Sequence, residues 1–245
     1  MLDHTFPRGT VAAVLGSAGF VGSQIVELLG TRGIPVLEAD VAGSNPAGDM
    51  SEEGVFQDLL ENFLERQPSR SSNILLVVST GLAVFTDTFE RSRKEIEDVL
   101  MTNIGIPIFA LNAIAKACRS REIKGSCVLV GSVFGSNVPR FSNYSHSARR
   151  SSEVYGASKA GLEQLARYYA SLLGKDGVRV NGVAPGGIYD PLTHTHDFVA
   201  AYSSDTALGR MTASEEVVDA VVFMLSEKST GITGQTLHVD CGFRL

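Results

Sequence analysis

The sequence lacks the features that define several classes of protein. Its three cysteines, Cys118, Cys127 and Cys241, have no metal-like spacing, and their odd number argues against a disulfide framework and fits a reducing cytoplasm. The net charge is −6, so no strong basic field points to a nucleic-acid partner. No apolar stretch reaches the ~18 residues of a membrane span, and the N-terminus lacks the apolar run of a signal peptide. We therefore expect a cytoplasmic protein that binds neither nucleic acid nor membranes.

What the chain does contain is an alternation of short apolar runs and longer amphipathic stretches. We expect strands at residues 10–15, 35–39, 74–79, 127–130, 178–183 and 236–239. We expect helices at residues 21–30, 52–66, 94–118 with a kink at Pro107, 155–173 and 214–225. This alternation predicts an α/β fold, a doubly wound, Rossmann-like parallel sheet flanked by helices, in a single domain over residues 1–245. Ligands of such sheets bind outside the carboxyl ends of the strands.

Three glycines, Gly16, Gly19 and Gly22, follow the first expected strand and open the first expected helix. Glycines let the backbone turn tightly and approach a pyrophosphate, and a helix N-terminus favours the anion. The alternative is a tight turn that binds nothing. The other candidate cofactor-binding residues of this turn are Ser17, Phe20 and Val21.

Asp40 ends the second expected strand. An acid about 20 residues beyond such glycines can bond both ribose hydroxyls of a dinucleotide. It would also repel a 2′-phosphate, so the sequence predicts NAD as the cofactor and disfavours NADP. No basic residue adjoins Asp40, and Arg32 precedes the strand. A capping or turn aspartate is the alternative.

Tyr155 and Lys159 stand four residues apart, so on a helix both side chains lie on one face, one turn apart. A free tyrosine has a pKa of about 10 and is a poor acid–base catalyst at neutral pH. An ammonium beside it favours the phenolate and is expected to lower that pKa. The pair could then exchange a proton with a substrate oxygen. The same spacing also occurs on surface helices whose lysine extends into solvent.

These features occur together in the order of one family. The chain resembles the short-chain dehydrogenase/reductases over nearly its whole length. The resemblance is carried by the glycine turn, Asp40, Asn103, Ser132, Tyr155 with Lys159, Pro185-Gly186, and the tail motifs Leu208-Gly209-Arg210, Gly231-Ile232-Thr233-Gly234 and Val239-Asp240. Each motif alone is weak evidence, whereas their shared order favours the family.

The resemblance implies a catalytic set made of Asn103, Ser132, Tyr155 and Lys159. Tyr155 would be the general acid–base, and Lys159 would lower its pKa and bind the nicotinamide ribose. Ser132, at the end of the expected strand 127–130, would hydrogen-bond the substrate oxygen. Asn103 would hold a water that relays protons to Lys159. The alternatives are a strand-end serine and a helix-interior asparagine without a catalytic role.

The resemblance also implies further cofactor contacts. Asp49 would bond the adenine amino group. Ser79 and Gly81 stand where the family has an Asn-Asn-Ala-Gly stretch, and Gly81 would keep the backbone close to the adenine ribose. The residues that would contact the nicotinamide end are Pro185, Gly186 and Ile188.

The chain also departs from the family in its glycine spacing and in the segment before Tyr155. Gly19 stands one position earlier than is usual, and Ser132 and Tyr155 stand farther apart than is usual. We expect the extra residues to form a substrate loop at about 136–153, with a solvated insertion as the alternative. Ser142 lies at the usual distance before Tyr155, but in a polar stretch and not at a strand end, so we favour Ser132. The Arg and His residues of the loop favour a polar substrate.

Residues 187–210 resemble the family's mobile lid. His194 and His196 form a His-x-His pair, but no acid or cysteine pattern accompanies it, so we expect no metal site. The threonine that usually contacts the cofactor carboxamide is replaced by Asp190, and nearby substitutes are Thr193 and Thr195.

The sequence thus predicts an NAD-dependent oxidoreductase that interconverts a secondary alcohol and a ketone of a small-molecule, sugar-like or otherwise polar substrate. The alternatives are an NADP-dependent carbonyl reductase, a catalytically silent dinucleotide sensor, and an epimerase or dehydratase with a resident NAD. The resemblance also implies a homotetramer or homodimer formed through two long helices, with apolar surface from Ala113, Ala117, Leu165, Tyr168 and Tyr169.

Overall fold

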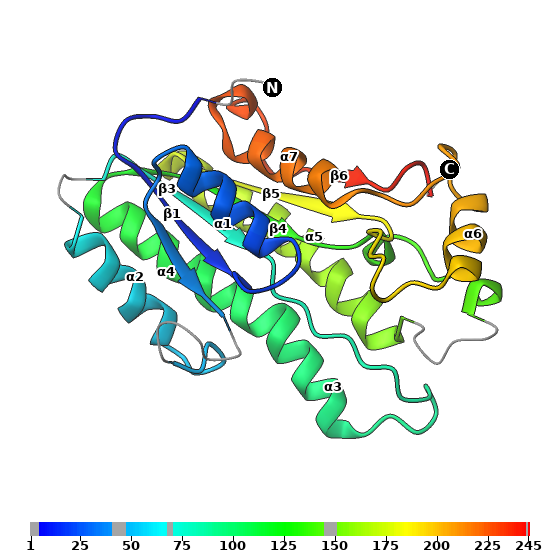
Figure 1. Ribbon diagram of the computed structural model, residues 1–245. Helices are drawn as coiled ribbons and strands as arrows, with labels where there is room; N and C mark the ends of the chain where they lie inside the picture. The colour runs from blue at the N-terminus through cyan, green and yellow to red at the C-terminus, as the bar shows by residue number, and fades with distance from the viewer. Residues whose placement is uncertain (1–4, 41–47, 68–70, 145–150, 244) are drawn as a thin grey trace.

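The computed structural model describes residues 5–40, 48–67, 71–144, 151–243 and 245. At its centre is a six-stranded sheet in the order β2-β1-β3-β4-β5-β6, and all neighbouring strands are parallel (Figure 1). The strands are β1 Thr10–Leu15, β2 Val36–Ala39, β3 Asn73–Val78, β4 Lys124–Val130, β5 Val178–Pro185 and β6 Thr236–Val239. The predicted doubly wound parallel sheet is confirmed.

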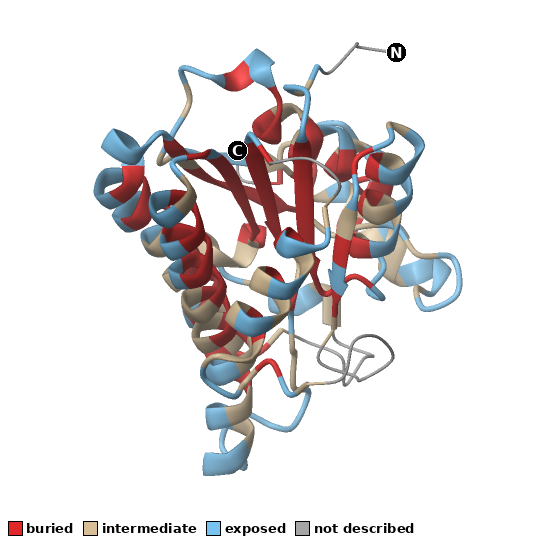
Figure 2. Ribbon diagram, turned by 90° about the vertical axis from the view of Figure 1, so that its left-hand side faces the viewer, coloured by how far each residue is buried: buried red, intermediate tan, exposed pale blue. Residues whose placement is uncertain are grey.

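Helices cover both faces of this sheet, and its central strands are therefore buried along their length (Figure 2). One hydrophobic core joins the sheet to α2 Val55–Glu65, α4 Ile106–Arg121 and α5 Glu153–Leu173. A second core joins the opposite face to α1 Gly22–Thr31 and α7 Ser214–Leu225. Two further helices are α3 Arg93–Leu100 and α6 His196–Ser204.

The strand order reverses at β1, which lies between β2 and β3. The register places Leu15, the last residue of β1, opposite Ala39 of β2 and Val78 of β3. The residues that follow these strand ends therefore meet at one edge of the sheet. In such folds this switch point is where ligands bind.

The expected helix 94–118 is a helical run, Arg93–Arg121, interrupted by a π-helical turn at Met101–Gly105. The interruption lies directly before Pro107, because proline has no N–H to donate to the carbonyl four residues earlier. By length and composition alone this run could cross a membrane, but half of its most apolar window is buried inside the molecule, as in a core helix.

The structure differs from the sequence prediction at several element boundaries and contains one helix that was not predicted. Helix α2 begins at Val55 because Gly54 precedes it in a left-handed conformation, with φ of +93°. Helix α6 was missed, although Thr195 caps it by accepting a hydrogen bond from the Phe198 N–H. In the expected substrate loop, positions 145–150 lie outside the described residues.

Candidate active site

The glycine turn after β1 is closely packed against the residues that follow β3. Gly16 has φ of +78°, and a Cβ atom there would lie 2.8 Å from the backbone of Ser79 and Thr80. A Cβ atom at Gly22 would overlap the carbonyl oxygen of Gly16. The Gly19 N–H donates to that same carbonyl at 3.1 Å. Only glycine fits at positions 16 and 22, so the turn keeps its backbone accessible at the start of α1.

The other residues of the turn have different environments. Ser17 is buried, Phe20 is half exposed, and Val21 is the N-cap residue of α1. The hydroxyl of Ser79 donates to the carbonyls of Leu15 and Gly16, at 2.9 and 3.2 Å. Ser79 therefore ties the end of β3 to the glycine turn.

Asp40 lies beside the glycine turn, where the sequence predicts it. Its Oδ2 accepts a hydrogen bond from the Ala18 N–H at 2.9 Å. This contact places a carboxylate next to backbone amides at a helix N-terminus, an arrangement that suits the ribose and pyrophosphate of a dinucleotide. The edge formed by β1, β2 and β3 thus has a shape and donor set that fit an NAD-type cofactor.

Asp49 and Gly81 are the two remaining predicted contacts at this end. Asp49 is exposed, and its Oδ1 accepts hydrogen bonds from the backbone N–H and hydroxyl of Ser51. These bonds lower the pKa of Asp49 below its ordinary value. A Cβ atom at Gly81 would lie 3.5 Å from Lys159 Nζ. The adenine contact of Asp49 stays a prediction.

Tyr155 and Ser132 come together at the carboxyl end of β4. Tyr155 lies in the first turns of α5, and Ser132 follows β4 by two residues. The Ser132 hydroxyl lies close enough to Tyr155 to lower its pKa, and Ser132 Oγ accepts from the Phe134 N–H at 3.2 Å. Ser142, the alternative serine, instead contacts Asn143 Oδ1 in a short exposed 3-10 helix. Ser132 thus lies at a strand end, as the sequence predicts for the candidate catalytic serine, whereas Ser142 does not.

The pKa of Tyr155 differs from the sequence prediction. Burial raises it above its ordinary value, and the nearby Ser132 hydroxyl acts in the opposite direction. The sequence predicted a lowered pKa, whereas burial, the largest cause, leaves the pKa raised. Lys159 Nζ lies 5.6 Å from the centre of the Tyr155 ring, and it donates to the carbonyls of Thr80 and Val130 at 3.3 and 3.1 Å.

Lys159 itself is almost fully buried, with 3% of its surface exposed. Burial lowers its pKa from 10.5 to about 8, because desolvation disfavours the ammonium. The two carbonyls satisfy part of its donor capacity and no carboxylate is hydrogen-bonded to it among the described residues. At neutral pH the protein therefore holds a costly buried cation beside Tyr155.

The cost of burying the Lys159 ammonium leads to a prediction about the stability of the protein. We expect Lys159→Met to raise the free energy of unfolding at pH 7 by about 1–3 kcal/mol while removing activity. The folded-state pKa of Lys159 lies below the unfolded value, so the gain is full below about pH 8 and fades as the pH rises toward 10.5. Urea unfolding at pH 7 and pH 10 measures it. Lys175→Met, at an exposed lysine, is the control, and an unstabilised Lys159→Met protein would contradict the prediction.

Asn103 lies in the π-helical turn and is fully buried. Its Oδ1 accepts from the Leu82 N–H at 2.8 Å, and its Nδ2 donates to the Leu82 carbonyl at 3.0 Å and to Ser158 Oγ at 2.9 Å. The side chain thus fixes the loop after β3 against α5. Pro107 leaves the backbone carbonyl of Asn103 without its usual helical donor, so this carbonyl is the group that could hold the predicted water.

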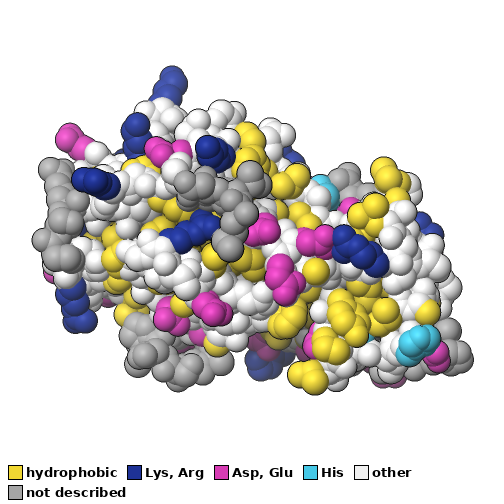
Figure 3. Space-filling view, turned by 45° about the horizontal axis from the view of Figure 1, so that its top comes forward, with side chains coloured by type: hydrophobic (Ala, Val, Ile, Leu, Met, Phe, Trp, Pro, Cys, Tyr) yellow, Lys and Arg dark blue, Asp and Glu magenta, His cyan; other side chains and the backbone are white. Residues whose placement is uncertain are grey.

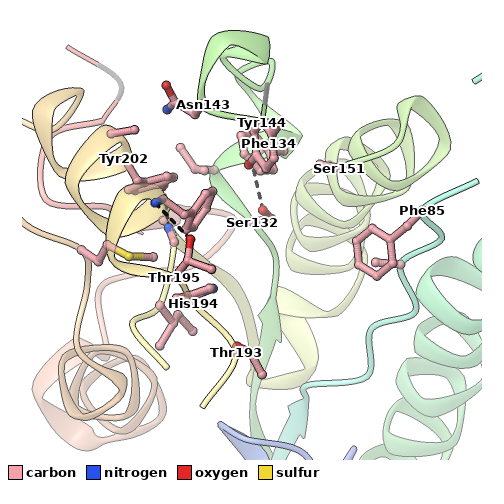
Figure 4. A pocket seen from close by; sticks show the side chains of 18 of the residues that line it. Phe85, Ser132, Phe134, Asn143, Tyr144, Ser151, Thr193, His194, Thr195 and Tyr202 are labelled. Atoms are coloured by element: carbon pink, nitrogen blue, oxygen red, sulfur yellow. Dashed lines mark hydrogen bonds between the residues drawn. The ribbon is translucent and has the colours of Figure 1, made fainter. Parts of the chain in front are cut away.

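A cavity of about 680 Å³ opens beside Tyr155 and Ser132. Gly186, Gly187 and Ile188, which follow β5, form part of its wall, and Pro185 ends that strand. Figure 4 shows Ser132 between two sides of the cavity, one carrying Phe85 and Ser151, the other carrying Thr195, His194 and Tyr202. The nicotinamide-end residues predicted from sequence therefore share one cavity with Ser132 and Tyr155.

The expected substrate loop and lid are in contact with each other. Arg140 Nη1 and Asn143 Nδ2 both donate to the carboxylate of Asp205, at 2.8 and 2.7 Å. The Tyr144 ring lies 5.6 Å from the Phe198 ring of α6. Several side chains of the lid segment also extend into solvent at this end of the molecule (Figure 3). The exposed hydrophobic ones are Tyr189, Leu192 and Leu208.

Sequence reasoning missed Tyr202 and Phe243. Tyr202 is buried in α6, its hydroxyl accepts from the Gly187 N–H at 2.6 Å, and its ring stacks on Phe243 at 4.9 Å. A Cβ atom at Gly187 would lie 2.8 Å from the Tyr202 ring. The one available signal was the Gly186-Gly187 pair, because adjacent glycines after a strand indicate close approach by another group.

The histidines and threonines of the lid are engaged locally. Asp190 accepts from the Thr193 hydroxyl at 2.7 Å and from the Leu192 N–H at 2.9 Å. Thr193, His194 and Thr195 line the cavity. Among the residues the structure describes, no group of three or more His, Cys, Asp or Glu side chains could hold a metal ion.

Comparisons with known proteins agree with this geometry. A family model described as enoyl-(acyl carrier protein) reductase matches residues 47–244. The 3-oxoacyl-[acyl-carrier-protein] reductase FabG of Escherichia coli is 27% identical over 249 residues, covering 96% of this chain and 97% of the relative. A tropinone reductase homolog of Arabidopsis thaliana is 31% identical over 255 residues, covering 96% and 92%. Flagellin modification protein A of Campylobacter coli is 32% identical over 157 residues, 64% of this chain and 60% of that protein.

Solved structures share the architecture. A short-chain dehydrogenase from Leptospira borgpetersenii with bound NAD⁺ is 26% identical, with a TM-score of 0.85 over 96% of this chain and 93% of that chain. A gluconate 5-dehydrogenase from Burkholderia cenocepacia, in complex with NADP and tartrate, has a TM-score of 0.81 at 19% identity over 99% and 98%, and shares the fold. The chain therefore belongs to the short-chain dehydrogenase/reductase family, whose members are oxidoreductases that act on CH–OH groups with NAD or NADP.

Proposed function

We propose that this protein is an NAD-linked oxidoreductase that interconverts a secondary alcohol and a ketone, with Tyr155 as the general acid–base. The proposal is carried by the placement of Ser132 and Tyr155 together at the wall of one cavity, with the buried Lys159 one helical turn from Tyr155. The two hydroxyls can hold a single substrate oxygen while a proton moves.

In the oxidative direction Tyr155 takes the proton of the substrate hydroxyl, and Ser132 donates a hydrogen bond to the oxygen as it becomes a carbonyl. When bound, the nicotinamide cofactor takes or gives the hydride. Lys159 places a positive charge near the Tyr155 ring, and that charge favours the phenolate during proton transfer. The cavity walls exclude bulk water and so strengthen these interactions.

The preference for NAD over NADP rests on Asp40. Its carboxylate, fixed by the Ala18 N–H, lies beside the glycine turn, where it accepts from ribose hydroxyls and repels a 2′-phosphate. The Leptospira relative binds NAD⁺, whereas the Burkholderia neighbour binds NADP. Both cofactors therefore occur on this fold, and we propose that Asp40 sets the preference of this chain for NAD.

We expect Asp40→Ala to shift the ratio of NAD affinity to NADP affinity by about 10- to 100-fold toward NADP, because it removes charge-assisted hydrogen bonds and a repulsive charge. Titrations of both cofactors into wild-type and variant protein measure the ratio. Glu38→Ala, at an exposed acid of the same strand, is the matched control. Wild-type protein that prefers NADP, or a ratio unchanged in Asp40→Ala, would overturn the proposed cofactor.

We also propose that the chain is a cytoplasmic homotetramer or homodimer. Helix α5 offers exposed Tyr168 and Leu172 for such contacts. Ala113 and Ala117 of α4 do not offer such a surface, because both are buried in the hydrophobic core.

A further inference from the structure

The cavity beside Tyr155 has an aromatic wall. The rings that line the cavity are Phe134, Tyr144, Phe198 and Tyr202, with Phe85 on the side opposite Tyr202 (Figure 4). The Tyr144 and Phe198 rings are 5.6 Å apart, and the Phe198 and Tyr202 rings 5.9 Å, so these three rings form a continuous wall from the inserted loop to the lid helix. The volume of the cavity, about 680 Å³, lies within the ~300–1,000 Å³ of pockets that enclose drug-sized ligands. A flat ring can pack on such a wall, whereas a short aliphatic alcohol leaves most of it uncovered.

One hydroxyl in this cavity has no partner. Ser151 lines the cavity, and its Oγ is buried without a hydrogen-bond partner among the described residues. Other hydroxyls of the same cavity are engaged: those of Ser132, Thr193, Thr195 and Tyr202. A buried hydroxyl without a partner is costly, so its presence at a cavity wall points to a ligand group that completes it.

The backbone holds Ser151 firmly in place. Ser152 caps α5 by accepting from the Tyr155 N–H at 3.2 Å. Glu153 forms an ion pair with Arg91 at 2.7 Å, and the Arg91 side chain is 3% exposed. Ser151 therefore directly precedes the N-cap residue of α5, four residues before Tyr155. Figure 4 shows it on the Phe85 side of the cavity, away from Tyr202.

We infer that the substrate is a cyclic alcohol or ketone whose ring packs on the aromatic wall and whose second polar group hydrogen-bonds Ser151 Oγ. Ser151 is then a specificity-determining residue, separate from the pair Ser132 and Tyr155 that holds the reacting oxygen. This inference rests on the proposed function, because it takes the reacting oxygen to lie at Tyr155.

Binding measurements test the inference apart from turnover. The probes are tetralone, a set of hydroxytetralones with the hydroxyl at successive positions of the aromatic ring, where it cannot be oxidised by hydride transfer, and a straight-chain ketone of equal carbon number. Isothermal titration calorimetry is run on the protein with and without NAD⁺, because a ketone cannot be reduced in the NAD⁺ complex. We expect tetralone to bind more tightly than the straight-chain ketone. At least one hydroxytetralone should bind about 5- to 10-fold more tightly than tetralone.

The Ser151→Ala variant should lose the gain from the hydroxyl and keep the affinity for tetralone. Ser171→Ala, at an exposed serine of α5, should keep both. Three results overturn the inference: equal affinity for tetralone and the straight-chain ketone, no gain from any hydroxyl position, or a gain that survives in Ser151→Ala. Failure of the proposed function looks different, because NADH would then neither form nor disappear with any alcohol or ketone, whatever these affinities are.

Discussion

Replacing Tyr155 with phenylalanine is expected to lower kcat by about 10²- to 10⁴-fold, the usual contribution of a general acid–base, while NAD⁺ still binds. Phenylalanine keeps the ring that lies beside Lys159 and removes only the hydroxyl, which shares the cavity with Ser132. The substrate oxygen then has no group that takes or returns its proton. Steady-state kinetics of NADH formation and calorimetric titration of NAD⁺ measure the two effects separately.

Tyr168→Phe is the matched control for this variant, because Tyr168 is an exposed tyrosine on the same helix. A Tyr155→Phe protein that keeps wild-type kcat would refute the role of Tyr155. Wild-type protein that binds NAD⁺ but turns over no member of a broad alcohol and ketone panel would favour a dinucleotide sensor. Tightly bound NAD with no net change in NADH would favour an epimerase or dehydratase.

Replacing Gly22 with alanine is expected to weaken NAD⁺ binding by at least about 100-fold and to lower thermal stability, because a new Cβ atom forces the backbone apart (~3 kcal/mol). That atom would overlap the carbonyl oxygen of Gly16 and lie 2.8 Å from Ser79 Oγ. Both neighbours belong to the contact between the glycine turn and the end of β3, so the turn has to open. NAD⁺ titration and a melting curve measure these effects.

Gly30→Ala provides the control within the same helix. No atom lies within 4 Å of a Cβ at Gly30, so alanine should stabilise α1 by about 0.5–1 kcal/mol and leave NAD⁺ binding unchanged. If Gly22→Ala bound NAD⁺ as tightly as Gly30→Ala does, the glycine turn would not be the pyrophosphate site.

The parts of the site that follow directly from strand ends could be predicted from the sequence. Gly16, Asp40 and Ser79 each come one residue after a strand, and a parallel sheet brings such residues to one edge. The choice of Ser132 over Ser142 followed from the same rule, and the structure places Ser132 with Tyr155 at the wall of the cavity.

The missed features depend on contacts between segments far apart in the chain. Tyr202 meets Gly187 only because α6 folds back over β5, and Phe243 reaches Tyr202 from the C-terminal end. Apart from the Gly186-Gly187 pair, which indicates a close approach but not the group that makes it, no local pattern encodes such contacts. The pKa of Tyr155 was mispredicted for a related reason, because spacing gives the position of Lys159 but not the burial that outweighs its charge.

The inserted loop illustrates the same limit. Its polar composition suggested direct contact with a polar substrate. Arg140 and Asn143 instead bind Asp205 at the end of the lid helix, whereas Ser142 and Ser151 of the described loop line the cavity. The substrate-facing part of the described loop includes Tyr144, which adds to the aromatic wall.

The contact between Tyr202 and Gly187 has a consequence for the thermodynamics of binding. Protein contacts alone hold α6 against the end of β5, so the conformational entropy of that helix is lost during folding and not when a substrate arrives. A preorganised wall of this kind raises affinity without any additional contact to the substrate.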